Sequence, residues 1–142
     1  MASIKISTGL KTYDIEDEKG NIRGQISFNP SDMNFFVRAQ ETQKKIEESI
    51  NSLSAITGES EEVIYAEMER VDKDIKEEIN RLFDDPHTSE VIFGNQNCLN
   101  TLNGVTFVER FLTAFAPIIK ADFKAETAKS NKRIEKYTKQ VK

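Results

Sequence analysis

Apolar side chains recur at three- and four-residue steps through two long stretches of the chain, the spacing that places them on one face of an α-helix. The first stretch follows Pro30, the second ends before Pro86, and residues 57–60, which include a glycine, separate them. Because two long helices joined by so short a break pack antiparallel, residues 31–86 are predicted to form a helical hairpin. Its apolar positions are Phe36, Ala39, Ile46, Ile50 and Leu53, with Gln43 at the missing step, and then Ile64, Met68, Val71, Ile75, Ile79 and Leu82.

The first 30 residues predict β structure. Apolar and polar side chains alternate in residues 3–7, 12–16 and 22–28, and the polar cluster at 17–21 is typical of a turn. So small a sheet is stable only with an apolar surface against one face. We therefore expect residues 1–30 to form a small antiparallel β segment that packs on the helices.

The clearest boundary in the sequence is the junction between these two parts. Pro30 forces the residue before it out of the helical region, and Ser31 or Asp32 can accept the hydrogen bonds that begin a helix. Phe28, Pro30 and Ser31 are therefore predicted to set the strand-to-helix corner.

A third helix is predicted over residues 105–126, where the sequence has its most apolar face. Pro117 lies within this pattern. Because its ring removes a hydrogen bond and collides with the preceding turn, it is predicted to kink the helix or to split it near Ala114. The core residues predicted on this helix are Phe107, Phe111, Phe115, Ile118 and Phe123, packed against Ile64, Met68, Val71, Ile75 and Ile79 of the hairpin.

The remaining two segments have weaker patterns. Residues 87–104 are predicted to form a loop with one short helix ended by Gly94 and a turn at Asn103. Residues 127–142 are a basic C-terminal tail with few apolar anchors, expected to order on contact with a partner. At 142 residues, the chain is expected to be a single domain of the α+β class, mostly α.

Charge is segregated along the chain, whose net value is −4. Residues 32–86 hold seven basic and fifteen acidic groups, a net charge of −8, whereas residues 118–142 hold eight basic and three acidic groups, a net charge of +5. The two regions can attract each other within one chain or between copies, or they can be two solvated helix faces. Nucleic-acid binding by the tail is disfavoured, because acidic residues interrupt it and bases have one aromatic residue after Phe123 to stack on. The predicted partner contacts are Lys132, Arg133, Lys136 and Tyr137.

The residue types that most enzymes need are scarce. The chain has one histidine, His87, and one cysteine, Cys98, so neither an intrachain disulfide nor a CxxC metal site is expected. The glycines are scattered, which excludes a phosphate-cradling loop, and the paired carboxylates lie on predicted solvated faces. We expect no catalytic residue, no cofactor, no metal and no membrane span. The composition favours a binding or assembly protein.

Four stretches carry a resemblance to known proteins: residues 24–32 (GQISFNPSD), 91–94 (VIFG), 111–119 (FLTAFAPII) and 130–138 (SNKRIEKYT). In this order they resemble small proteins encoded in the tail and structural gene modules of tailed bacteriophages and prophages of Gram-positive bacteria. The resemblance implies a tail assembly chaperone in the cytoplasm of the bacterial host. Such a chaperone would bind tail-tube subunits or hold the tape-measure protein, a long helical chain, soluble until tube subunits polymerise around it.

Two other functions stay open at this stage. One is a minor structural subunit of the tail or connector, present in the virion as a homo-oligomer. In such a ring, residues 2–28 would add strands to a neighbouring sheet and the basic tail would dock on the next acidic hairpin. The other is a DNA-packaging accessory protein, whose binding to DNA would weaken steeply with salt.

Overall fold

A computed structural model describes the backbone of residues 1–141. Within the last helix it describes side chains up to residue 121 and at residues 124, 125, 128, 129 and 132. The fold is α+β and mostly α, which confirms the predicted class. In chain order the elements are β1 (Lys11–Glu16), β2 (Ile22–Phe28), α1 (Met33–Ser52), the 3-10 helix η1 (Leu53–Ile56), α2 (Glu61–Phe83), α3 (Thr88–Phe93), β3 (Thr101–Leu102), β4 (Val105–Thr106) and α4 (Phe107–Val141).

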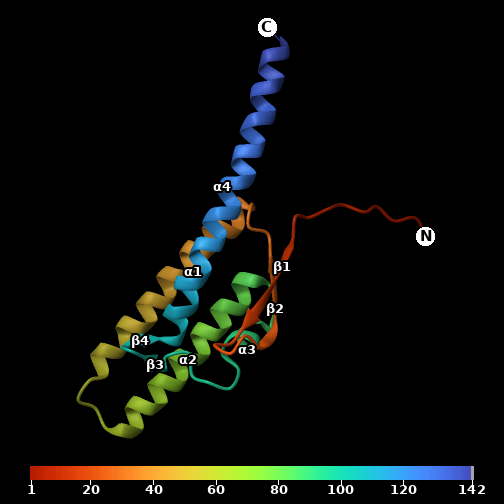
Figure 1. The fold of residues 1–142 in the computed structure, drawn as a ribbon. Coiled ribbons are helices and arrows are strands. Elements are labelled where there is room, and N and C mark those ends of the chain that lie inside the picture. Colours follow the sequence, from red (N-terminus) through yellow and green to blue (C-terminus); the bar gives the residue numbers. More distant parts are fainter. Residues whose placement is uncertain (142) are drawn as a thin grey trace.

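The helical hairpin forms as predicted. Figure 1 shows α1 and α2 side by side and antiparallel, while α4 runs back along α1 and the β1–β2 pair lies beside the end of α2. Helix α3 packs against both β2 and α2. Asp32 caps α1, because its carboxylate accepts a hydrogen bond from the Asn34 amide at 3.0 Å. Ser60 caps α2 through the Val63 amide.

The buried face of α1 differs from the prediction by one position. Phe35 and Thr42 are buried beside Ile46, whereas Phe36 is half-buried and Gln43 is exposed. Neighbouring residues on a helix are about 100° apart around its axis. At these two positions, the buried side of α1 is therefore rotated from the predicted side by that angle. The stripe predicted for α2 is correct from Val71 onwards, while Ile64 and Met68 are only half-buried.

The first ten residues do not join the sheet, so the prediction of β structure is wrong for residues 2–10. Strand β1 pairs with β2 alone, from Lys11 opposite Phe28 to Glu16 opposite Ile22. Gly9 has a φ of +81°, and the Asn29 side-chain amide donates a hydrogen bond to the Thr8 carbonyl at 2.8 Å. The alternating pattern indicates that these residues can form a strand, but a strand forms only where another strand offers an edge to pair with.

The strand-to-helix corner involves the predicted residues. Phe28 and Pro30 are buried, and the exposed Ser31 donates hydrogen bonds from its amide and its hydroxyl to the Asn29 side-chain oxygen, at 3.0 and 2.9 Å. These two bonds tie Ser31 to the residue that also binds Thr8. The corner therefore fixes both the start of α1 and the direction in which the N-terminal segment leaves.

Helix α4 is continuous through Pro117, so of the two outcomes predicted there, a kink or a split near Ala114, the split is wrong. Phe115 and Ile119 are buried on either side of the proline. Their packing offsets the cost of a proline inside a helix, which is about 3 kcal/mol for the lost hydrogen bond and the collision with the preceding turn together. Val108 is also buried, while Phe107 and Phe111 are half-buried.

Ile118 was predicted in the core, but 40% of it is exposed. The reason is that Phe115 and Ile119, four residues apart, define the buried face, and Ile118 lies about 100° from Ile119 around the helix. Phe123 lies outside the residues whose side chains the structure describes.

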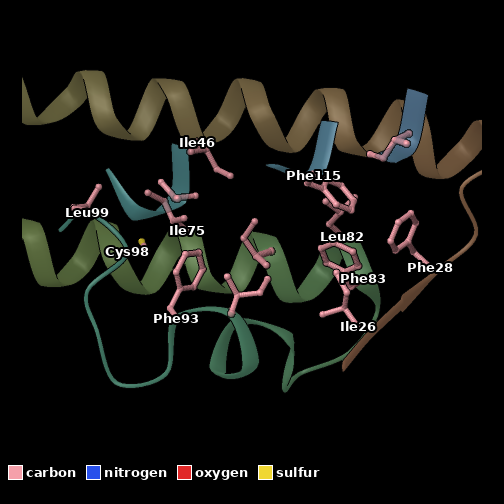
Figure 2. Close-up of a cluster of buried hydrophobic side chains, with 14 of the residues drawn as sticks. Ile26, Phe28, Ile46, Ile75, Leu82, Phe83, Phe93, Cys98, Leu99 and Phe115 are labelled. Carbon is pink, nitrogen blue, oxygen red and sulfur yellow. The ribbon is translucent and has the colours of Figure 1, made fainter. Parts of the chain in front are cut away.

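The core has an aromatic end and an aliphatic end (Figure 2). At the aromatic end, Phe28 stacks on Phe35 with ring centroids 5.1 Å apart and meets Phe115 edge-on at 5.0 Å. Phe83, which the sequence pattern missed, contacts the same cluster. The other end is aliphatic except for the Phe93 ring, and it gathers buried residues from α1, α2, α3, the following loop and α4: Ile46, Val71, Ile75, Ile79, Phe93, Cys98, Leu99 and Val108.

Candidate protein-binding surfaces

An apolar groove lies between strand β1 and helix α4, and we call it the β1–α4 groove. Its volume is about 390 Å³. Four consecutive residues of β1, from Tyr13 to Glu16, line one side. Ile26 and Phe28 of β2 and Ile92 of α3 form the floor, so the groove lies over the inner face of the sheet. Because consecutive side chains of a strand point to opposite faces, the presence of both Tyr13 and Asp14 in the lining shows that the groove also reaches the edge of β1. Phe107, Phe111, Ala114 and Ile118 of α4 line the other side, and a second hollow continues the groove to Ala121.

Stacked aromatic rings support both walls of the β1–α4 groove. The Tyr13 ring stacks on Phe28 with centroids 4.8 Å apart, and Phe111 stacks on Phe115 at 5.4 Å. Phe28 and Phe115 are themselves buried, and side chains packed in this way keep single rotamers. The groove therefore has a preformed apolar surface. Ile118 is exposed because its side chain lines this groove.

The two rims of the groove differ in charge. On β1, Asp14 and Glu16 are exposed, and Asp14 accepts a hydrogen bond from the Gln25 side-chain amide at 2.9 Å. On α4, the Arg110 guanidinium lies 5.1 Å from the centre of the Phe107 ring and donates to the Val105 carbonyl at 2.6 Å. Arg110 thus contacts residues around the start of its own helix. The exposed carboxylates of Asp14 and Glu16 give the β1 rim a negative charge.

A polar cleft lies between α1 and α2, on the acidic hairpin. Its cations are paired with neighbouring acids: Arg70 contacts Glu67 at 2.7 Å and Asp74 at 3.0 Å, and Lys45 lies 3.8 Å from Glu78. The hydrogen bond from Arg70 lowers the pKa of Glu67. Exposed pairs of this kind add little to stability, so this cleft is a solvated face with net negative charge.

Helix α4 carries basic residues beyond the body of the fold. Lys120, Lys124, Lys129 and Lys132 are exposed. Figure 1 shows the last turns of α4 extending past the helical hairpin, with no other described helix or strand beside them. Of the four partner contacts predicted from the sequence, Lys132 is exposed as expected. The other three, Arg133, Lys136 and Tyr137, have side chains outside those described.

Cys98 and His87 each lie close to a carboxylate of a neighbouring residue. The Cys98 amide donates to the Asp72 carboxylate at 2.7 Å, and Asp72 also pairs with Lys76 at 3.1 Å. Burial raises the pKa of the Cys98 thiol well above its usual range. His87 is exposed, with its Nδ1 3.7 Å from the Glu90 carboxylate. Among the residues that the structure describes, no group of three His, Cys, Asp or Glu side chains could hold a metal ion.

In the native protein, Cys98 is expected to react with a chromogenic disulfide reagent at pH 8 at least about 100-fold more slowly than in the urea-unfolded chain. The thiol has no exposed surface, and its raised pKa leaves little of the reactive thiolate. Absorbance of the thiolate that the reagent releases measures both rates. Equal rates would mean that the loop carrying Cys98 opens readily.

The comparisons with known proteins give no relative. No protein-family model, curated protein or solved structure matches the chain. Over the described residues, no helix has the length and apolar character required to span a membrane.

Sequence reasoning located the basic helix end but missed the β1–α4 groove. Tyr13 and Ile15 were identified as the apolar face of a strand, and Phe111 and Ile118 as core residues. A usable signal was present, because residues 107–123 hold more apolar positions than one buried face can cover.

Proposed function

We propose that this chain is an assembly protein of a phage tail module, and that it binds the tape-measure protein as a chaperone in the host cytoplasm. The observation that carries the proposal is the basic end of α4, which extends past the body of the fold with exposed Lys120, Lys124 and Lys132. A helix presented in this way can pair with an amphipathic helix of a partner, and acidic residues on that partner would set the register. The resemblance of the sequence to phage tail-module proteins supplies the biological context.

The acidic hairpin supports the same function. Lys45, Arg70 and Arg81 pair with neighbouring acids, and residues 32–86 have a net charge of −8, so the hairpin repels other copies of itself. A protein that keeps an aggregation-prone helical chain soluble needs both a binding surface and a repelling one. The two surfaces lie on different elements, α4 and the α1–α2 hairpin.

The test is capture of the tape-measure protein encoded in the same gene module, co-expressed with the tagged full-length chain. Replacing two exposed lysines, Lys124→Glu with Lys132→Glu, is expected to lower the captured amount at least about tenfold, because attraction becomes repulsion at both positions. The matched control is Lys44→Glu with Lys73→Glu, which makes the same charge change at two exposed positions of the helical hairpin. Capture that is equal for the double variant and the wild type would contradict the proposal.

The second candidate, a structural subunit of the virion, is favoured by the exposed apolar residues Ile4, Ile6 and Leu10 of the N-terminal segment, which a subunit could insert into its neighbour. Mass spectrometry of purified virions separates the two functions. A chaperone is expected to be absent from the virion, and a subunit is expected in fixed copy number.

A further inference from the structure

Residues 1–10, which we call the arm, expose apolar side chains in an alternating pattern. Ile4, Ile6 and Leu10 are 90%, 78% and 62% exposed, and Ser3, Lys5 and Ser7 alternate with them. Figure 1 shows the arm leading away from the start of β1. Such a period-two pattern is that of a strand with one face buried, and in this chain that face has nothing from its own fold against it among the described residues.

The β1–α4 groove offers the surface that such a strand needs. The sheet order is β1–β2, so the outer edge of β1 faces no strand in the part of the chain that the structure describes. The groove borders this edge, and its opposite wall is apolar. A strand laid along β1 would extend the sheet and place alternate side chains against α4.

The lengths agree. Six residues of β1 span about 20 Å as a strand, and residues 107–121 of α4 span about 22 Å as a helix. The seven arm residues before Thr8, which the Asn29 amide holds, cover about 23 Å when extended. The part of the arm that precedes Thr8 therefore matches the length of the groove.

The charges agree as well. The arm residues 1–10 contain one charged side chain, Lys5, and no acidic residue. The outward-facing side chains of β1 include Asp14 and Glu16, both exposed. If Ile4 and Ile6 face α4, then Lys5 faces outward beside these carboxylates, and a pair of opposite charges on adjacent strands is stabilising.

The base of the arm is tied to Asn29, the residue that follows β2. The Asn29 amide holds the Thr8 carbonyl at 2.8 Å, and Gly9 adopts a φ of +81° at this point. A Cβ at Gly9 would lie 2.8 Å from the Asn29 side-chain nitrogen, so the close approach requires glycine. The arm is thereby held away from its own β1 edge.

We propose that the arm of one copy of this chain inserts as an added strand into the β1–α4 groove of a second copy. The partner is identical in sequence, so each copy both gives and receives a strand. Reciprocal exchange closes a two-fold dimer, whereas exchange in one direction builds a ring or a chain. The inference goes beyond the binding of a tail protein and does not depend on it.

The first experiment measures the mass of the purified full-length chain by light scattering. At about 100 µM, wild type is expected as a dimer or larger oligomer, since a Kd in the micromolar range suffices. The variant Ile4→Asn with Ile6→Asn is expected to weaken self-association at least about 100-fold and therefore to be mainly monomeric at about 10 µM. The matched control Ser3→Asn with Ser7→Asn introduces the same two amide side chains on the outward face of the arm. It is expected to keep the wild-type mass.

The second experiment asks whether the arm and the groove are the two halves of the contact. Ala114 is exposed and lines the groove, so Ala114→Trp should block it without disturbing the core. The arm variant and the groove variant are each expected to be monomeric, and an equimolar mixture is expected to form a one-to-one complex, because one intact arm then meets one intact groove.

A wild-type chain that is monomeric at about 100 µM would overturn the proposal. Two monomeric variants that fail to associate on mixing would do so as well. Neither result would bear on capture of the tape-measure protein, which depends on the lysines of α4.

Discussion

Replacing Phe28 by alanine is expected to lower the free energy of unfolding by about 3–5 kcal/mol. The Phe28 ring is 3% exposed. It meets rings from β1, α1, α2 and α4: Tyr13 at 4.8 Å, Phe35 at 5.1 Å, Phe83 at 5.8 Å and Phe115 at 5.0 Å between centroids. Removing it leaves a cavity where the strands, α1 and α4 converge. None of these elements can close the cavity without leaving its other contacts. Urea unfolding followed by far-UV circular dichroism measures the change.

The matched control for this variant is Tyr65→Ala on α2. Tyr65 is 65% exposed, so its removal is expected to change the free energy of unfolding by less than about 0.5 kcal/mol. If Phe28→Ala costs less than about 1 kcal/mol, the β1–β2 pair is not anchored to the helices. The wall that β1 gives to the groove would then not be preformed.

The helical elements could be predicted from the sequence because periodicity and boundary residues agree there. Pro30, the break at residues 57–60 and Pro86 delimit two helices that α1 and α2 confirm. The pattern did not decide between adjacent positions, which is why Gln43 was chosen where Thr42 is buried. Thr42 is small enough to pack against a neighbouring element, and only the tertiary structure shows which residue that element covers.

The candidate surfaces were predictable only in part. The basic end of α4 is a property of local composition, so charge counting finds it. The β1–α4 groove joins residues 13–16 to residues 107–121, and no local pattern reports a contact over that separation. The same limit explains the errors at Ile118 and at residues 2–10, because in both places apolar side chains were assigned to this chain's own core.

Gly24→Ala is expected to lower the free energy of unfolding by about 2–4 kcal/mol. Gly24 pairs with Ile15 at the irregular end of the sheet, and its φ of +158° is one that other residues rarely adopt. A Cβ there would also lie 2.8 and 3.0 Å from the two methyl carbons of Val91 on α3. The cost therefore has two parts, one from the backbone and one from the overlap with Val91.

A second substitution separates these two parts. Val91→Ala removes the methyl groups that the new Cβ would meet, so the double variant is expected to be more stable than the sum of the two single effects by about 1–2 kcal/mol. Gly20→Ala is the matched control: its φ is +80° and nothing lies within 4 Å of the added carbon, so it is expected to cost about 1 kcal/mol from the backbone alone. Additive effects of Gly24→Ala and Val91→Ala would show that β2 and α3 can move apart. Coupled effects would show that close packing of β2 on α3 holds the sheet, and with it the β1 edge, in place.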